Sequence, residues 1–240
     1  MSCILNIETS TSVCSVALSM DGEVLFAKAS FDGPSHAALL GVFVEDALSV
    51  LKKKGKKALD AVAVSSGPGS YTGLRIGVSV AKGLCFGFGI PLIGIHTLDI
   101  MAATVNSKGD SQIVSMTDNC LYCAMLDARR MEVYAAIYDA SLKPVRETKA
   151  DIVEVGTYAS YLEKGKVCFF GNGASKCKSV ITSPNAIFIE DIHPLAVNMI
   201  PLSEQAFAAG KFEDTAYFEP FYLKAVSYTH LRAHETRGNL

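Results

Sequence analysis

The most distinctive segment that could do chemistry spans residues 65–77 and reads Ser-Ser-Gly-Pro-Gly-Ser-Tyr-Thr-Gly-Leu-Arg-Ile-Gly. Residues 59–64 form a short apolar run before it, which predicts a buried strand, and a helical pattern follows. A glycine-rich junction between a strand and a helix can aim backbone N–H groups at a phosphate. It can instead let two backbones approach closely, because glycine has no Cβ. The segment lacks the Gly-Lys-Ser/Thr ending of a Walker loop, so the rest of the chain must decide between these uses.

Glu8 and Asp127 are acidic residues at the ends of predicted strands, where nucleotide chemistry would need them. Each is followed by a short loop and a second strand, so the second half of the chain weakly repeats the first. Two related lobes of the actin and sugar-kinase type have this layout and grip nucleotide phosphates between two acid-bearing hairpins. Such a grip needs exposed glycine N–H groups, and the loops 8–12 and 127–130 contain no glycine. We therefore expect no cofactor.

Cysteine and histidine patterns could in principle bind a metal. Cys120 and Cys123 form a CxxC pair, but positions i and i+3 of a strand point to opposite faces, so the two thiols would not share one ion. His36 opens a predicted helix, but Leu40 stands where a second histidine would be needed. No Ser-His-Asp arrangement stands out. We expect no metal site and no catalytic residue.

Residues 225–240 change character abruptly after the aromatic run at 217–223. His230 and His234 stand there in the HxxxH spacing that can place two metal ligands on one helical face. The segment resembles a translated adaptor or cloning scar, and such additions are excluded from fold reasoning. We therefore expect a non-native tail and discount both histidines as ligands.

The composition is that of a globular protein, with 240 residues, 50% hydrophobic and 19% charged, and a net charge of -2. This charge gives no global attraction to nucleic acid or to anionic membranes. Lysines at 52–54 and 56–57 form a local patch that is either solvated or in contact with RNA. Seven scattered cysteines favour a reducing cytoplasm over a disulfide framework. The longest apolar tract, 83–95, is too short to span a bilayer.

The elements that must position these residues alternate between strands and helices. Asp21-Gly22 between two alternating runs predicts a tight hairpin, so the chain begins as a three-stranded meander. The first lobe is expected to hold strands at 3–7, 13–19, 23–29, 59–64 and 90–95, with helices at 36–53, 71–86 and 97–103. The second lobe is expected to hold strands at 112–117, 121–126, 132–138 and 167–170. We expect an α/β fold with an N-terminal lobe at 1–104, a C-terminal lobe at 105–224 and the tail at 225–240.

Small residues recur on the two predicted helices. Gly73, Gly77 and Ala81 are spaced by four, which leaves a flat groove that another backbone could enter. Ala37 and Gly41 repeat this spacing on the first helix. Glycine costs about 1 kcal/mol against alanine inside a helix, so these residues need a packing reason. That reason is either packing on the chain's own sheet or contact with a partner.

Several of these segments together resemble the TsaB family, also called YeaZ. The matching stretches are 7–10, 35–36 before an apolar helix, 66–77, 127–129 and 132–134, and the resemblance covers about residues 3–224. It implies a two-lobed actin-like ATPase fold (ASKHA, ribonuclease H-like) with mixed sheets. It also implies a non-catalytic member of that superfamily.

The resemblance further implies partners. Members pair with TsaD, a homologue that keeps an HxxxH metal site. With TsaE, that pair transfers threonylcarbamoyl from threonylcarbamoyl-adenylate to the adenosine beside the anticodon of tRNAs reading codons that begin with A. We therefore expect a cytoplasmic scaffold subunit that binds and activates TsaD and meets tRNA through the complex. The alternatives are a stand-alone ATPase or glycoprotease-like enzyme, or a homodimer.

The expected partner interface lies on the helices 36–53 and 71–86. It comprises His36, Ala37, Leu40, Gly41, Ser70, Tyr71, Gly73, Leu74, Arg75, Gly77, Val78 and Ala81.

Overall fold

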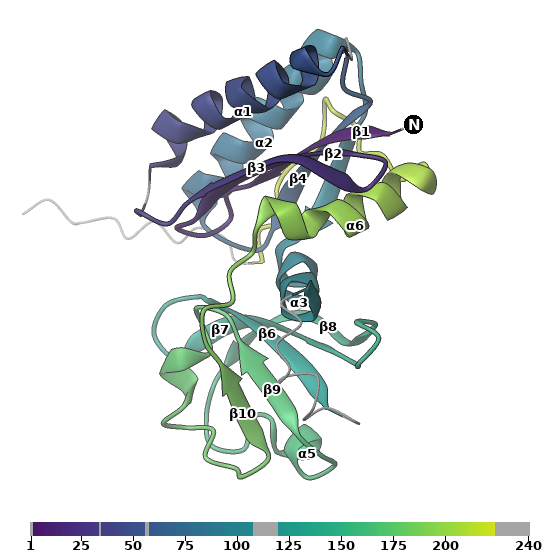
Figure 1. Cartoon of the computed structure of the whole chain (residues 1–240). Helices are drawn as coiled ribbons and strands as arrows, with labels where there is room; N and C mark the ends of the chain where they lie inside the picture. The colour runs from purple at the N-terminus through teal and green to yellow at the C-terminus, as the bar shows by residue number, and fades with distance from the viewer. Residues whose placement is uncertain (1, 34, 56–57, 108–119, 224–240) are drawn as a thin grey trace, which may run out of the picture.

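The structure is a computed structural model that describes residues 2–33, 35–55, 58–107 and 120–223. These residues form two lobes, one above the other in Figure 1. The predicted strand at 112–117, two of the lysines in the basic patch and the predicted tail with its two histidines lie outside the described residues.

The first lobe is built on a five-stranded sheet in the order β3-β2-β1-β4-β5. Its strands are β1 (Cys3–Glu8), β2 (Cys14–Met20), β3 (Glu23–Ser30), β4 (Ala61–Gly67) and β5 (Leu92–His96). β1, β2 and β3 form an antiparallel meander, which confirms the predicted hairpin at Asp21 and Gly22. β4 pairs in parallel with β1, and β5 pairs in parallel with β4. The carboxyl ends of these three strands therefore meet at one edge, where α/β proteins place their ligand sites.

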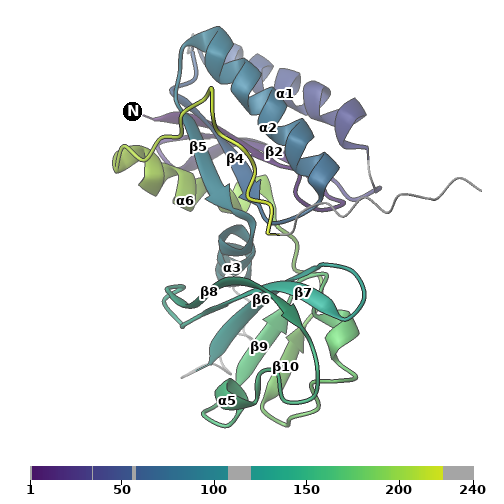
Figure 2. The same cartoon turned by 180° about the vertical axis from the view of Figure 1, so that it is seen from behind.

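Helices cover both faces of this sheet. α1 (His36–Lys53) and α2 (Tyr71–Phe88) lie side by side on one face, and α6 (Ala196–Ala208) lies on the other (Figures 1 and 2). The apolar stripe of α1 packs into the core through Leu40 and Val44, as the sequence predicts. α2 ends at Gly89, whose φ of 64° is the left-handed conformation that terminates many helices.

The second lobe repeats the first. Its sheet has the order β10-β9-β6-β7-β8, with strands β6 (Leu121–Asp127), β7 (Glu132–Tyr138), β8 (Pro144–Ile152), β9 (Val167–Phe170) and β10 (Ala186–Ile189). β6, β7 and β8 form an antiparallel meander, and β9 and β10 are added in parallel. This matches the first sheet strand for strand, with β6 in the place of β1. The chain thus has the two-lobed actin-like, ribonuclease H-like fold with mixed sheets.

Short helices and α3 complete the second lobe. α5 (Ala159–Leu162) and a 3-10 turn (Ser175–Cys177) lie near one face of its sheet, and α3 (Thr97–Ser107) packs on the other through Leu98 and Met101. Within the residues described, no helix is both long enough and apolar enough to cross a membrane.

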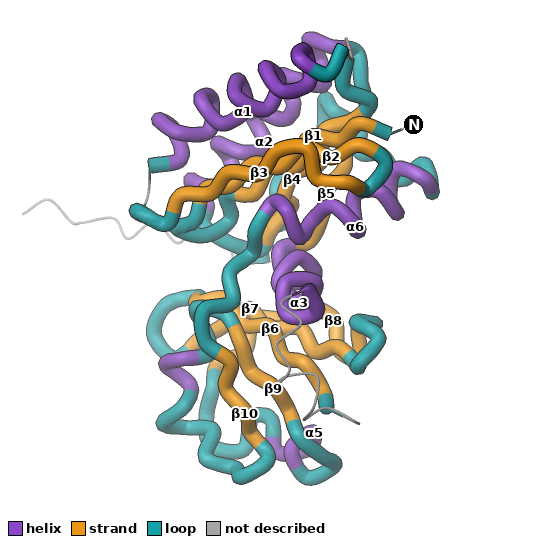
Figure 3. Tube along the Cα trace, in the orientation of Figure 1, coloured by secondary structure: helices purple, strands orange, loops and turns teal. Residues whose placement is uncertain are grey.

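The distribution of the chain between the lobes differs from a simple division at residue 104. α3 contributes Leu98 and Met101 to the apolar core of the second lobe and Ile100 to a cluster of the first sheet, whereas α6 returns to the first sheet, where Met199 and Ile200 are buried. Figure 3 shows α6 running along the first sheet and α3 between the lobes. The chain also comes back at Phe221, whose N–H donates to the Ser66 carbonyl at 2.7 Å. The first lobe is therefore completed by α6 and by residues near Phe221, which come after the second lobe in the chain.

Candidate functional site

The glycine segment lies against the loop that follows β1. A Cβ added at Gly69 would come within 3.0 Å of the Ser10 backbone, and one added at Gly73 would do the same with the Thr9 carbonyl oxygen. At Gly77, an added Cβ would strike the Thr9 hydroxyl. Glycine is required at Gly69 and Gly73 because another backbone passes too close for any side chain, and at Gly77 because the Thr9 side chain fills the space. The segment serves close packing within the chain.

Hydrogen bonds tie the two segments together. The Ser70 N–H donates to the Ser10 carbonyl at 2.7 Å, and the Thr9 hydroxyl donates to the Gly73 carbonyl at 2.8 Å. The Ser70 hydroxyl caps α2 by accepting from the Gly73 N–H at 3.2 Å. One of the helix N–H groups that a phosphate would use is therefore already occupied by the chain itself.

Glu8 ends β1 and is fully buried beneath this junction. Its Oε1 accepts from the Ser10 N–H at 2.5 Å, and its Oε2 has no hydrogen-bond partner among the described residues. Burial raises the pKa of the Glu8 carboxyl to about 7, because charging it in an apolar interior is costly. Glu8 is not presented to a cleft.

His36 begins α1 and points back at the same loop. Its side chain is buried, and its Nε2 lies 2.7 Å from the Thr11 carbonyl oxygen. Because a carbonyl is an acceptor, this geometry requires Nε2 to carry the proton. His36 therefore fixes the loop after β1. In the part of the chain that the structure covers, no three His, Cys, Asp or Glu side chains gather as a metal would need.

The second lobe repeats this junction in a more open form. Gly67 ends β4 with a φ of 103°, and Gly171 follows β9 with a φ of 98°. A Cβ at Gly171 would strike the Met125 carbonyl on β6, just as the first glycine segment meets the end of β1. The sequence already indicates a strand followed by a small-residue turn at 171–175, and the structure shows what that turn packs against.

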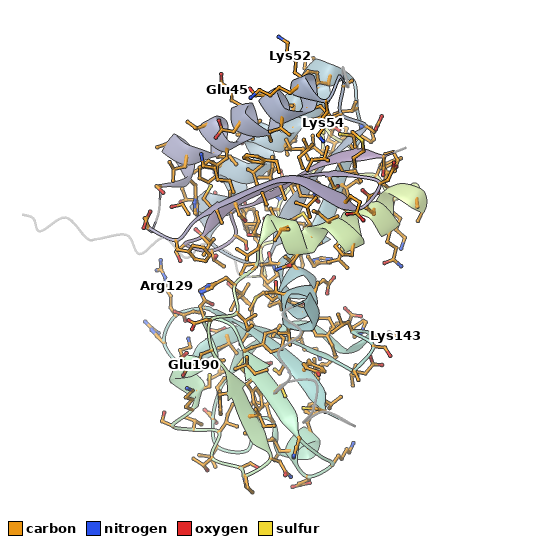
Figure 4. The ribbon with its side chains drawn as sticks, viewed as in Figure 1. Glu45, Lys52, Lys54, Arg129, Lys143 and Glu190 are labelled. Atoms are coloured by element: carbon orange, nitrogen blue, oxygen red, sulfur yellow. The ribbon has the colours of Figure 1, made fainter. Side chains whose placement is uncertain are left out.

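Asp127 holds the position of Glu8 but is exposed. It forms an ion pair with Lys176 and accepts from the Arg129 N–H at 2.9 Å. Arg129 and Arg130 adopt positive φ values of 69° and 49°, which non-glycine residues seldom do. Figure 4 shows Arg129 at the end of the second lobe that faces the first. The two matched acids thus lie in unlike environments, since Glu8 is fully buried and Asp127 is exposed and paired with a lysine.

Cys120 and Cys123 separate as the strand geometry predicts. Cys120 belongs to the apolar cluster under α3, and Cys123 belongs to the cluster on the opposite face. The two thiols therefore cannot chelate one ion.

The predicted interface residues divide into two groups. Buried within the chain are His36, Leu40, Gly73, Leu74, Gly77, Val78 and Ala81. Exposed are Ala37, Gly41, Ser70, Tyr71 and Arg75. The expectation of an open groove along Gly73, Gly77 and Ala81 needs correction, because Thr9 and the core fill it. Within the exposed group, the Arg75 guanidinium donates to the Tyr71 hydroxyl at 2.7 Å.

A different small-residue surface faces outward. Gly41 on α1 and Gly83 and Gly87 on α2 have no atom within 4 Å of an added Cβ. Val42, which follows Gly41 in the chain, is 49% exposed, and Phe86, which precedes Gly87, is 88% exposed. We use the name outer face for exposed residues of these two neighbouring helices: Ala37, Gly41 and Val42 on α1, and Ser79, Gly83, Phe86 and Gly87 on α2. Ala37 and Gly41 were predicted from the sequence, but the α2 residues were missed, although Gly83 and Gly87 repeat the same spacing of four.

A cavity of about 410 Å³ lies between the lobes beside α3. His96 and Phe221 line it from the first lobe, and Asp99, Tyr138 and Glu147 line it from α3 and the second sheet. The Tyr138 hydroxyl donates to Asp99 Oδ1 at 2.7 Å. This hydrogen bond joins α3 to β7 across the cavity wall.

Comparison with known proteins places these features in a family. A family model described as TsaD, tRNA N6-adenosine threonylcarbamoyltransferase, matches residues 32–192. The tRNA threonylcarbamoyladenosine biosynthesis protein TsaB of Escherichia coli K12 is 31% identical over 92% of this chain and 94% of its own. TsaB of Buchnera aphidicola is 27% identical over 85% of this chain and 93% of its own.

The solved structures agree with the sequence comparison. YeaZ from Pseudomonas aeruginosa is 26% identical, with a TM-score of 0.76, over 93% of this chain and all of that one. This similarity spans both lobes, and the topology of the two matched sheets accounts for it. The chain therefore belongs to the TsaB (YeaZ) family of tRNA threonylcarbamoyladenosine biosynthesis proteins.

Proposed function

We propose that this chain is a non-catalytic scaffold subunit that binds TsaD through the outer face and activates it. In the cytoplasm, the pair and TsaE would then transfer threonylcarbamoyl to the adenosine beside the anticodon of tRNAs that read codons beginning with A. The family's role in threonylcarbamoyladenosine biosynthesis supports this proposal, and tRNA is met through the complex.

The outer face is the observation that carries the proposal. Each of its three helical glycines costs about 1 kcal/mol against alanine, or about 3 kcal/mol together, and none has an internal packing reason. Phe86 is left 88% exposed beside them. An exposed aromatic side chain flanked by side-chain-free helix surface suits the close approach of a second helix pair. A partner's helices would bury Phe86 and use the space above Gly41 and Gly83.

The junction after β1 supports a non-catalytic role. The loop 8–11 is buried, and its contacts go to the glycine segment and to His36. Glu8, which stands where a catalytic or metal-binding acid would be expected, is fully buried and accepts a hydrogen bond from the N–H of Ser10 in its own loop. These residues stabilise the base of α1 and α2, the helices that carry the outer face.

Complex formation tests the proposal. The purified chain is mixed with TsaD of the same organism, and the mass is measured by size-exclusion chromatography with light scattering. We expect a one-to-one heterodimer and, once TsaE is added, faster threonylcarbamoyl transfer to tRNA than TsaD gives without this chain. Two separate peaks would contradict the proposal. A dimeric mass for the isolated chain would support the homodimer alternative.

The alternative of a stand-alone ATPase or glycoprotease-like enzyme makes a different prediction. The isolated chain would hydrolyse ATP or a glycoprotein, and the activity would fall in Asp127→Asn, because Asp127 is the exposed member of the matched acids. We expect no hydrolysis above that of buffer by the isolated chain. Turnover that is lost in Asp127→Asn would favour the enzyme alternative.

A further inference from the structure

Cys120 and Cys168 form a buried thiol pair in the second lobe. Their Sγ atoms lie 2.9 Å apart, which is within about 1 Å of the length of a disulfide bond. Each residue is only 2% exposed. This contact is separate from the CxxC pattern, since Cys123 lies on the other face of the sheet.

Strand pairing explains the contact. β6 and β9 are adjacent parallel strands in which Tyr122 pairs with Cys168. Cys120 directly precedes β6, and side chains two positions apart share one face of a strand. Cys120 and Cys168 therefore project from neighbouring strands into the same apolar cluster, beneath Leu98 and Met101 of α3.

The two thiols have unlike acidities. A hydrogen bond from the Cys168 thiol, with a smaller contribution from the Lys166 charge, lowers the pKa of Cys120. The same interaction, with Cys120 as the charged partner, raises the pKa of Cys168. The 2.9 Å contact allows either thiol to attack first. Because a thiolate is the reactive form of cysteine, we assign Cys120 as the nucleophile and Cys168 as the resolving thiol, and the Cys168→Ser variant below tests this assignment.

We propose that Cys120 and Cys168 are a peroxide-sensitive dithiol that closes reversibly to a disulfide. The Cys120 thiolate attacks one oxygen of hydrogen peroxide, the O–O bond breaks, and hydroxide leaves, giving the Cys120 sulfenic acid. Cys168 then attacks that sulfur as its proton is lost, the S–O bond breaks, and hydroxide leaves again. With the released protons, the balance is two thiols and one peroxide to one disulfide and two waters.

The disulfide would tie the start of β6 to β9 on the face that packs against α3. It would join positions 48 residues apart in the chain, and a crosslink of that span restricts the unfolded chain strongly. Oxidation would therefore make the second lobe harder to unfold. For a chain of this size we expect the Tm to rise by about 5–15 °C.

Peptide mapping of the full-length chain tests the proposal. The chain is treated with one equivalent of hydrogen peroxide, free thiols are alkylated, and tryptic peptides are identified by mass spectrometry. We expect two of the seven thiols to be lost, a disulfide between the peptides that contain Cys120 and Cys168, and a Tm rise that dithiothreitol reverses. Cys120 and Cys123 lie on one tryptic peptide, so the Cys123→Ser chain is mapped as well and should keep the crosslink.

Cys168→Ser separates the two steps of the reaction. In this variant the Cys120 sulfenic acid should persist and be trapped by dimedone, with no disulfide. Mapping of the wild-type chain decides the question if the variant fails to fold. Two results of the mapping would overturn the proposal: a crosslink that is lost in Cys123→Ser, or oxidation of Cys120 to the sulfinic acid without a disulfide. A third uses glutathione, added to the same sample as a control for the oxidant. The proposal fails if all seven thiols of the chain stay free under conditions that fully oxidise this glutathione.

Discussion

Glu8→Gln should remove a pH dependence of stability that the wild-type chain possesses. In the folded chain Glu8 is fully buried, and burial moves its pKa from 4.5 to about 7. The unfolded chain releases this proton near pH 4.5, whereas the folded chain keeps it until about pH 7. The contribution of Glu8 to the free energy of unfolding therefore falls as the pH rises between these two values, and it does not change further above them.

The size of the effect follows from the two pKa values. One pKa unit corresponds to about 1.4 kcal/mol, so the wild-type chain should lose about 3 kcal/mol of stability between pH 4.5 and pH 8 through Glu8. The glutamine side chain of the variant cannot ionise, although its carbonyl can still accept from the Ser10 N–H. Its amide group leaves a buried donor unpaired, at a cost of about 1–3 kcal/mol that does not depend on pH. The diagnostic quantity is therefore the slope with pH.

Urea denaturation at pH 5, 6, 7 and 8 measures this slope for both chains. From pH 5 to pH 8, we expect the wild-type chain to lose about 2–3 kcal/mol more of its free energy of unfolding than Glu8→Gln loses. Glu45→Gln is the matched control, because Glu45 is an exposed residue of α1 (Figure 4) and should leave the wild-type slope unchanged. Parallel profiles for the wild-type and Glu8→Gln chains would refute the assignment of a raised pKa to Glu8.

Substitutions in α2 and at the lobe junction test the packing. Gly73→Ala should lower the free energy of unfolding by about 1–3 kcal/mol, because its Cβ meets the Thr9 carbonyl. The Cβ of Gly83→Ala, in the same helix, meets no atom, so this variant should raise the free energy of unfolding by about 1 kcal/mol. Urea denaturation measures both variants, and a change in the same direction for both would contradict the packing described for α2. Tyr138→Phe removes the hydrogen bond to Asp99 and should cost about 1 kcal/mol by the same assay; an unchanged midpoint would show that this bond does not hold α3 to β7.

Much of the fold could be predicted from local pattern. The first meander, both long helices and the strands β6, β7 and β9 have clear apolar periods, and the structure contains each of them. β8 (Pro144–Ile152) was missed, because this edge strand carries charged residues and has little apolar alternation. α6 was missed because Pro201 lies inside it and obscures the helical pattern. The return of α6 to the first sheet depends on long-range packing that no local pattern contains.

The candidate site shows a different limit. The spacing of Gly73 and Gly77 correctly indicated close backbone packing, but spacing does not reveal which surface fills the groove. The residue that fills it, Thr9, lies 64 positions from Gly73 in the chain. Gly83 and Gly87 have the same spacing of four but lie on a neighbouring stripe of the helix. Only the burial of each stripe distinguishes the internal face from the outer face. The lobe repeat, by contrast, was visible from Glu8 and Asp127 because each ends a strand.

The affinity of outer-face variants for TsaD tests the central claim most directly. Val42→Arg places a charge on the outer face, and Val155→Arg places the same charge on an 89% exposed valine of the second lobe. Isothermal titration calorimetry with TsaD should show that Val42→Arg weakens binding about 30-fold or more, as loss of an interface hot spot does. Val155→Arg should bind as the wild-type chain does, and both variants should keep the wild-type Tm. Equal affinity of the two variants would contradict the claim that the outer face holds TsaD.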